Sequence, residues 1–228
     1  MARERGSDGW RLRAENVARA ALRRSVWALT MPVRLLIEAT EPKAEAFGIR
    51  LVASGCDPAG KNAIFFAKTT LALQLIAEHD PHRLARLQHD LRSIWLGDVG
   101  PSSYASRTCT LSWKTIAYDS PLDLALVIVH EGVHARLHAS GVTNGTAARM
   151  EREERAAVRQ QIAFASRFPD SERRIREWEA ALERRWWTRT ARHEYFQRLA
   201  TAGEIPAWIA RVAQLANRMV IPREPKQR

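Results

Sequence analysis

The string His130-Glu131-Gly132-Val133-His134 contains the residue types that hydrolytic zinc sites use. On a helix, side chains at i and i+4 lie one above the other, so the imidazoles of His130 and His134 can reach a single Zn²⁺. Glu131 is turned by about 100° from His130, close enough to hold a water beside the ion without binding the ion itself. The string therefore predicts metal-assisted hydrolysis, provided that it lies on a helix.

The residues around the string predict that helix. Ser120 can cap it, Pro121 suits its first position, and Asp123 completes a capping-box pattern. The residues that follow are apolar nearly all round, which is typical of a buried helix, and Gly141 can end it. We predict a buried helix from 121 to 139. Histidines on such a helix need partners, because unsatisfied polar groups in a core cost free energy, and a metal ion would supply them.

A catalytic zinc ion also needs a third protein ligand, which the histidine stripe does not supply. His138 continues the spacing, but it lies about 12 Å from His130 along the helix axis, too far for one ion. We expect His138 to be a partly exposed residue at the helix end. The longer pattern H-E-x-x-H-x-x-G-x-x-H is absent, because Leu137 and Ser140 occupy its Gly and third His positions.

A carboxylate is the remaining choice for the third ligand. Glu151, Glu153 and Glu154 open a second predicted helix, which runs from 149 to about 167. Glu154 shares one face of that helix with several apolar residues, so its side chain is the most embedded of the three. We favour Glu154 as the third ligand. Glu151 and Glu153 remain open alternatives, since acidic residues also occur at helix N-termini for electrostatic reasons alone.

This set of residues resembles the zincin metallopeptidases, and among them the gluzincins, in which a Glu on the next helix completes a His-His-Glu site. The resemblance is carried by His130, Glu131, His134 and Glu154. It implies an α+β fold, mainly helical, with a small mixed β-sheet packed on the motif helix. It also implies a zinc metallopeptidase acting on a peptide or protein substrate, in which Glu131 is general base and acid toward a zinc-activated water. Arg136 is a departure, because zincins more often carry an apolar residue there.

A further polar group often stabilises the negative charge that develops in such reactions. His193, Tyr195 and Tyr118 are candidates by position in the sequence. For each of them we favour the simpler explanation, a surface residue of an amphipathic helix, so none is assigned a role.

Hydrophobic periodicity outlines the remaining elements. It predicts helices over 10–30, 62–79, 81–91, 172–201 and 206–220, and strands over 47–53, 93–96 and 108–118. We expect one domain over 1–228, in which residues 1–45 form an N-terminal helical arm and residues 170–228 form C-terminal helices.

Composition sets limits on the class of protein. The chain has a formal net charge of +11, with 36 Lys and Arg against 25 Asp and Glu. That charge makes nucleic acid a possible partner, although no nucleic-acid-binding signature accompanies it. The alternative hypothesis is thus a basic helical binding protein, for nucleic acid or an acidic partner, in which the motif is inert or structural. The only cysteines, Cys56 and Cys109, suggest reduced thiols, and no run is long enough to span a bilayer, so we expect a cytoplasmic protein.

Overall fold

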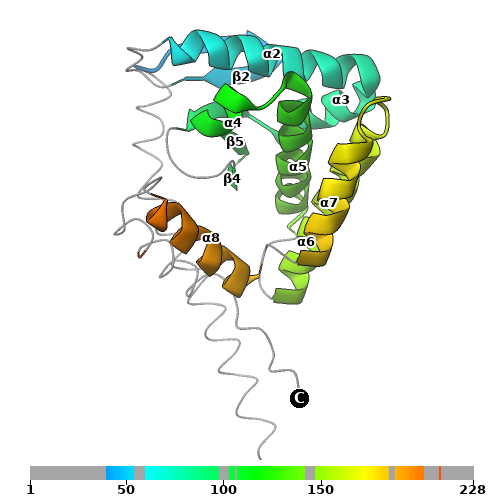
Figure 1. Cartoon of the computed structure of the whole chain (residues 1–228). Coiled ribbons are helices and arrows are strands. Elements are labelled where there is room, and N and C mark those ends of the chain that lie inside the picture. The colour runs from blue at the N-terminus through cyan, green and yellow to red at the C-terminus, as the bar shows by residue number, and fades with distance from the viewer. Residues whose placement is uncertain are drawn as a thin grey trace, which may run out of the picture.

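The computed structural model describes residues 40–53, 60–97, 103–105, 107–141, 147–184, 188–202 and 211. Its mixed five-stranded sheet has the order β1-β2-β3-β5-β4, in which β2, β3 and β5 are parallel and the outer strands β1 and β4 are antiparallel to their neighbours. The strands are β1 (Lys43–Ala46), β2 (Ile49–Val52), β3 (Ser93–Gly97), β4 (Ser103–Ala105) and β5 (Thr108–Ser112). Helices make up most of the rest, so the predicted α+β class, mainly helical with a small mixed sheet, is confirmed (Figure 1).

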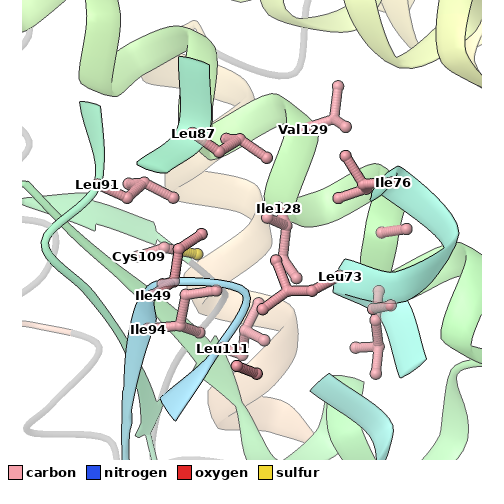
Figure 2. Packing of buried hydrophobic residues seen from close by; sticks show 14 of the residues in the cluster. Ile49, Leu73, Ile76, Leu87, Leu91, Ile94, Cys109, Leu111, Ile128 and Val129 are labelled. Carbon is pink, nitrogen blue, oxygen red and sulfur yellow. The ribbon is translucent and has the colours of Figure 1, made fainter. Parts of the chain in front are cut away.

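The helices are α2 (Lys61–His79), α3 (Pro81–Asp90), α4 (Trp113–Tyr118), α5 (Pro121–Ala139), α6 (Ala147–Ala165), α7 (Glu172–Arg184) and α8 (Arg189–Thr201). The core lies where strand side chains meet α2, α3 and α5. Figure 2 shows Ile94 and Leu111 of the sheet beside Leu73 of α2 and Ile128 of α5. Among the described helices, none has both the length and the apolarity that crossing a bilayer would require.

Helix α5 carries the motif and has the bounds that the sequence predicted. Its N-terminus is a capping box: the Ser120 hydroxyl accepts the Asp123 N–H at 3.2 Å, and the Asp123 carboxylate accepts the Ser120 N–H at 3.3 Å. Arg174 of α7 forms an ion pair with the same carboxylate. Because α5 packs against α2, α3, α6, β4 and β5, its apolar surface is buried on nearly every side.

Gly132, inside the motif, lets α5 approach α3 closely. A Cβ built at this position would lie 2.2 Å from Cδ2 of Leu87, a buried core residue. We expect Gly132→Ala to lower the free energy of unfolding by about 1 kcal/mol, because overpacking costs roughly 1–3 kcal/mol and better helix propensity returns up to about 1. Urea denaturation measures the change.

The matched control shortens the side chain of Leu87, which is the neighbour that the new methyl group would meet. In a Leu87→Ala background, Gly132→Ala should become neutral or stabilising, because the clash is gone and only the helix-propensity gain remains. A penalty of equal size in both backgrounds would contradict the steric explanation.

Three element boundaries differ from the predictions. Residues 108–118 were expected to be a strand, but the strand ends at Ser112, whose hydroxyl accepts the Thr115 N–H at 3.1 Å and starts α4. Lys68 of α2 stabilises this short helix from outside, since its Nζ donates to the carbonyl oxygens of Ile116 (2.7 Å), Ala117 (3.2 Å) and Asp119 (3.0 Å). The last carbonyls of α4 therefore find a partner that lies far away in the sequence.

The strand predicted over 47–53 is the second half of a hairpin. Phe47 and Gly48, with φ of 51° and 69°, form its two-residue turn, so the strand begins at Ile49. Strand β1 therefore begins within the segment 1–45 that was assigned to the N-terminal arm, yet it belongs to the sheet. Residues 1–39 of that arm, which include the predicted helix over 10–30, lie outside the described residues.

The helix predicted over 172–201 is two helices. Thr188 caps α8 by accepting the Ala191 N–H at 3.3 Å, so the chain restarts a helix there instead of continuing α7. Of the helix predicted over 206–220, the structure describes residue 211 alone. The other predicted elements, over 62–79, 81–91, 93–96, 121–139 and 149–167, are confirmed to within two residues at each end.

Candidate metal centre

His130 and His134 lie on the same face of α5, which is the face that packs against α6. Their Nε2 atoms are 3.1 Å apart. The structure brings Glu154 of α6 to both of them, with its Oε2 atom 3.3 Å from Nε2 of His130 and 3.6 Å from Nε2 of His134. Across the described residues, this trio is the one group of histidine, cysteine or acidic side chains whose donor atoms converge closely enough for a metal ion.

The three side chains are buried to different degrees. His130 is 6% exposed and Glu154 is 5% exposed, whereas His134 is half-buried. The cluster is therefore closed on the His130 side and approachable from the His134 side. A catalytic metal centre needs this asymmetry, because one coordination position must stay accessible to water and substrate.

The other two candidate acids on α6 are placed elsewhere. Glu151 pairs with Arg155 one turn further along the helix, at 3.0 Å. Glu153 is buried, and its burial raises the pKa of its carboxyl group although His134 and Arg149 act in the opposite direction. Of the three glutamates, the structure thus joins Glu154 to the histidines.

Glu131 is buried next to the cluster but is not a member of it. Burial raises the pKa of the Cys109 thiol well above its usual value, and the Glu131 carboxylate raises it further, so Glu131 lies close to β5. The same carboxylate also acts on His130. Glu131 is therefore near His130 without being one of the three converging donors, which is the position that a general base beside a metal ion would need.

The electrostatics of the metal-free cluster couple His130 to Glu154. Burial alone would lower the pKa of His130, but the hydrogen bond with Glu154 and the charges of Glu131 and Glu154 outweigh it, so the pKa is raised. Burial would likewise raise the pKa of Glu154, but its bonds to His130 and His134 hold that pKa well below the usual range. Without a metal, the buried carboxylate is kept ionised by imidazole protons.

This coupling predicts how the stability of the chelator-treated protein depends on pH. The raised pKa of His130 contributes stability below its ordinary value of 6.5, and this is lost as pH rises through the folded value. The lowered pKa of Glu154 contributes stability above its ordinary value of 4.5, lost as pH falls through the folded value. We expect the free energy of unfolding in urea to be larger at about pH 5.5 than at about pH 9.

Glu154→Gln is the control for this pH dependence, because it removes the charge that raises the pKa of His130. The difference in unfolding free energy between the two pH values should shrink in this variant. An identical difference in both proteins would contradict the coupling between His130 and Glu154.

Gln161 is a site residue that the sequence analysis did not assign. Its Oε1 lies 2.9 Å from Nδ1 of His130, and the side chain is 1% exposed. The sequence contained one indication of its position, the spacing from Glu154. Residues seven apart, such as Glu154 and Gln161, lie on one helix face two turns from each other. Spacing alone could not show that this face meets His130.

Among the side chains that the structure describes, His138, Tyr118 and His193 are not joined to the cluster. His138 is exposed at the end of α5, as expected. Tyr118 is 83% exposed at the end of α4, and Pro121, three residues later, is still about 13 Å along the α5 axis from His130. His193 is half-buried on α8, whereas the side chain of Tyr195 lies outside the described part of the structure. Neither Tyr118 nor His193 receives a catalytic role.

Arg136, the departure from the zincin pattern, points away from the cluster. Its Nε lies 3.7 Å from Oδ2 of Asp90, at the end of α3. Positions 134 and 136 are about 200° apart around a helix, so an arginine at 136 does not disturb the ligand face.

Comparisons of this chain with protein-family models, with curated proteins and with solved structures found no match.

Proposed function

We propose that this chain is a zinc-dependent hydrolase that cleaves peptide bonds, with His130, His134 and Glu154 as the metal ligands and Glu131 as the general base. The observation that carries the proposal is the spacing of the three donor atoms, 3.1, 3.3 and 3.6 Å. Ligands at roughly 2.0–2.1 Å from a tetrahedral zinc ion lie about 3.3 Å from one another. The donor set also fits, because two imidazoles and one carboxylate leave a fourth position open.

When bound, Zn²⁺ would polarise the scissile carbonyl and lower the pKa of a coordinated water toward neutrality. Glu131 would then accept the water proton and deliver it to the leaving nitrogen. The Glu154 carboxylate would be an anionic ligand at neutral pH, because zinc favours the ionised form of a coordinating acid. Burial of His130 and Glu154 would keep bulk water away from the inner side of the centre.

The choice of a peptide substrate is supported by the sheet edge near the motif. Strand β4 is an outer strand, antiparallel to β5, and it contacts α5. No described strand pairs with its outer side. An extended peptide can add to such an edge through main-chain hydrogen bonds, and this edge belongs to a strand that contacts the helix carrying the site.

The same features support a zincin-like arrangement of the gluzincin type. The motif helix packs against the sheet beside an antiparallel edge strand, and the carboxylate comes from the next helix, α6. The sequence resemblance implies the sheet packed on the motif helix and the Glu on the next helix.

Metal analysis of the purified protein tests the proposal first. We expect one zinc per chain, removable by a chelator and restored by added Zn²⁺. Incubation with a diverse peptide mixture, followed by mass spectrometry, should then give cleavage products that disappear on chelation and return with zinc. A protein that is isolated without zinc, and does not take it up at micromolar concentration, would overturn the metal site.

The competing hypothesis of a basic binding protein makes a different prediction. It expects salt-dependent association with nucleic acid or acidic partners that a chelator leaves unchanged, and no chelator-sensitive cleavage. A titration of labelled nucleic acid with and without chelator, run beside the cleavage assay, separates the two functions.

A further inference from the structure

The two ring nitrogens of His130 face different helix positions on α6. Nε2 points to Glu154 and His134, at 3.3 and 3.1 Å, whereas Nδ1 points to Oε1 of Gln161 at 2.9 Å. His130 is 6% exposed and Gln161 is 1% exposed, so water does not compete for the Nδ1 contact. The environment of this imidazole is therefore set by protein groups on both sides.

A neutral imidazole carries one proton, on one nitrogen, and only the other nitrogen has a lone pair for a metal. The amide oxygen of Gln161 has no proton to give, so the contact requires the proton to be on Nδ1. We propose that Gln161 is a positioning residue, which holds His130 in the Nδ1-protonated tautomer and so presents the Nε2 lone pair to the metal. This inference deepens the proposed metal site and depends on it only for its consequence for zinc binding.

The opposite tautomer, with the proton on Nε2, would leave no lone pair on Nε2 of His130 to bind the metal. A proton on Nε2 of His130 would point at Nε2 of His134 and Oε2 of Glu154, where the ion would have to sit. Glu154 and Gln161 are two turns apart on the same face of α6, so one rigid helix contacts both nitrogens of the ring. Partners of this kind fix ring orientation and tautomer in metal centres generally.

The first test uses no metal and removes the Glu154 carboxylate, which competes for a proton on Nε2 of His130. Long-range ¹H–¹⁵N spectra of the chelator-treated Glu154→Ala chain, recorded at a pH where His130 is neutral, report which ring nitrogen carries the proton. We expect Nδ1 to be protonated and Nε2 to be bare. A spectrum with the proton on Nε2 would overturn the proposal, whether or not the protein proves to be a hydrolase.

The second test compares zinc affinity among variants, measured by competition with a chromogenic chelator. Gln161→Leu has nearly the same size but no acceptor, and we expect it to weaken Zn²⁺ binding by about 10- to 100-fold. Gln161→Glu keeps an oxygen at the same place and should bind Zn²⁺ at least as tightly as the unmodified chain. Gln160→Leu, at the exposed neighbouring position, is the matched control and should leave the affinity unchanged.

The outcomes separate this proposal from the proposed function. Equal zinc affinity of the Gln161→Leu and Gln160→Leu chains would overturn the positioning role while leaving the metal site intact. A loss in Gln161→Leu that Gln161→Glu does not rescue would show a packing effect, which also overturns it. Zinc binding without any peptide cleavage would count against the hydrolase alone.

Discussion

Glu131→Gln is expected to abolish peptide cleavage while the protein still binds one zinc per chain. The amide has the same size as the carboxylate but cannot accept the proton of the attacking water, so we expect the rate to fall by about 10²–10⁴-fold, the contribution of a positioned general base. Zinc should be retained because Glu131 is not among the three converging donors. Zinc content and initial cleavage rates, measured on the same preparation, check both halves of this prediction.

Glu179→Gln makes the same chemical change on the exposed surface of α7 and serves as the control. It should leave cleavage and zinc content unchanged. Substantial cleavage by the Glu131→Gln protein would exclude Glu131 as the base, and loss of its zinc would show that the carboxylate is needed to hold the metal.

Loss of any one metal ligand should have the second large effect, on zinc binding itself. His130→Ala, His134→Ala and Glu154→Ala each remove one of the converging donor atoms. Zinc binding of roughly 10–16 kcal/mol in four-ligand structural sites corresponds to about 3 kcal/mol per ligand, or more than about 100-fold in affinity. We expect losses of that order, together with loss of cleavage. Competition with a chromogenic chelator measures them.

Two neighbouring residues provide matched controls for the ligand variants. His138→Ala removes an exposed histidine one turn beyond His134, and Glu151→Ala removes an acid that pairs with Arg155. Both should bind zinc like the unmodified chain. A ligand set that includes Glu151 in place of Glu154 would reverse the results for the two glutamates, which makes the assignment on α6 directly testable.

The motif helix could be predicted from the sequence because its determinants are local. Ser120, Pro121 and Asp123 specify its start within a few residues, and an apolar run specifies that it is buried. The i, i+4 spacing then puts His130 and His134 on one face as a property of any α-helix. The fold class could be predicted for the same reason, because the hydrophobic periodicity that indicates a helix or a strand lies within the segment itself.

Contacts between segments that are distant in the sequence could not be predicted from these local patterns. The helix α4 replaced a predicted strand because the Ser112 hydroxyl caps it and Lys68, more than 40 residues earlier, binds its last carbonyls. The contact with Lys68 cannot be predicted from the periodicity of residues 113–118. A short segment with an ambiguous pattern takes the conformation that its neighbours stabilise.

For the candidate metal centre, too, the sequence predicted what one segment contains and the packing decided the rest. Sequence alone specified two histidines and an acid beside them, because one helix carries all three. It left open Glu151, Glu153 and Glu154, which at 100° per residue point in different directions around α6. Only the packing of α6 against α5 turns Glu154 toward the histidines and brings Gln161 to the far side of the His130 ring. Helix-to-helix register depends on side chains of both partners at once, so no single segment encodes it.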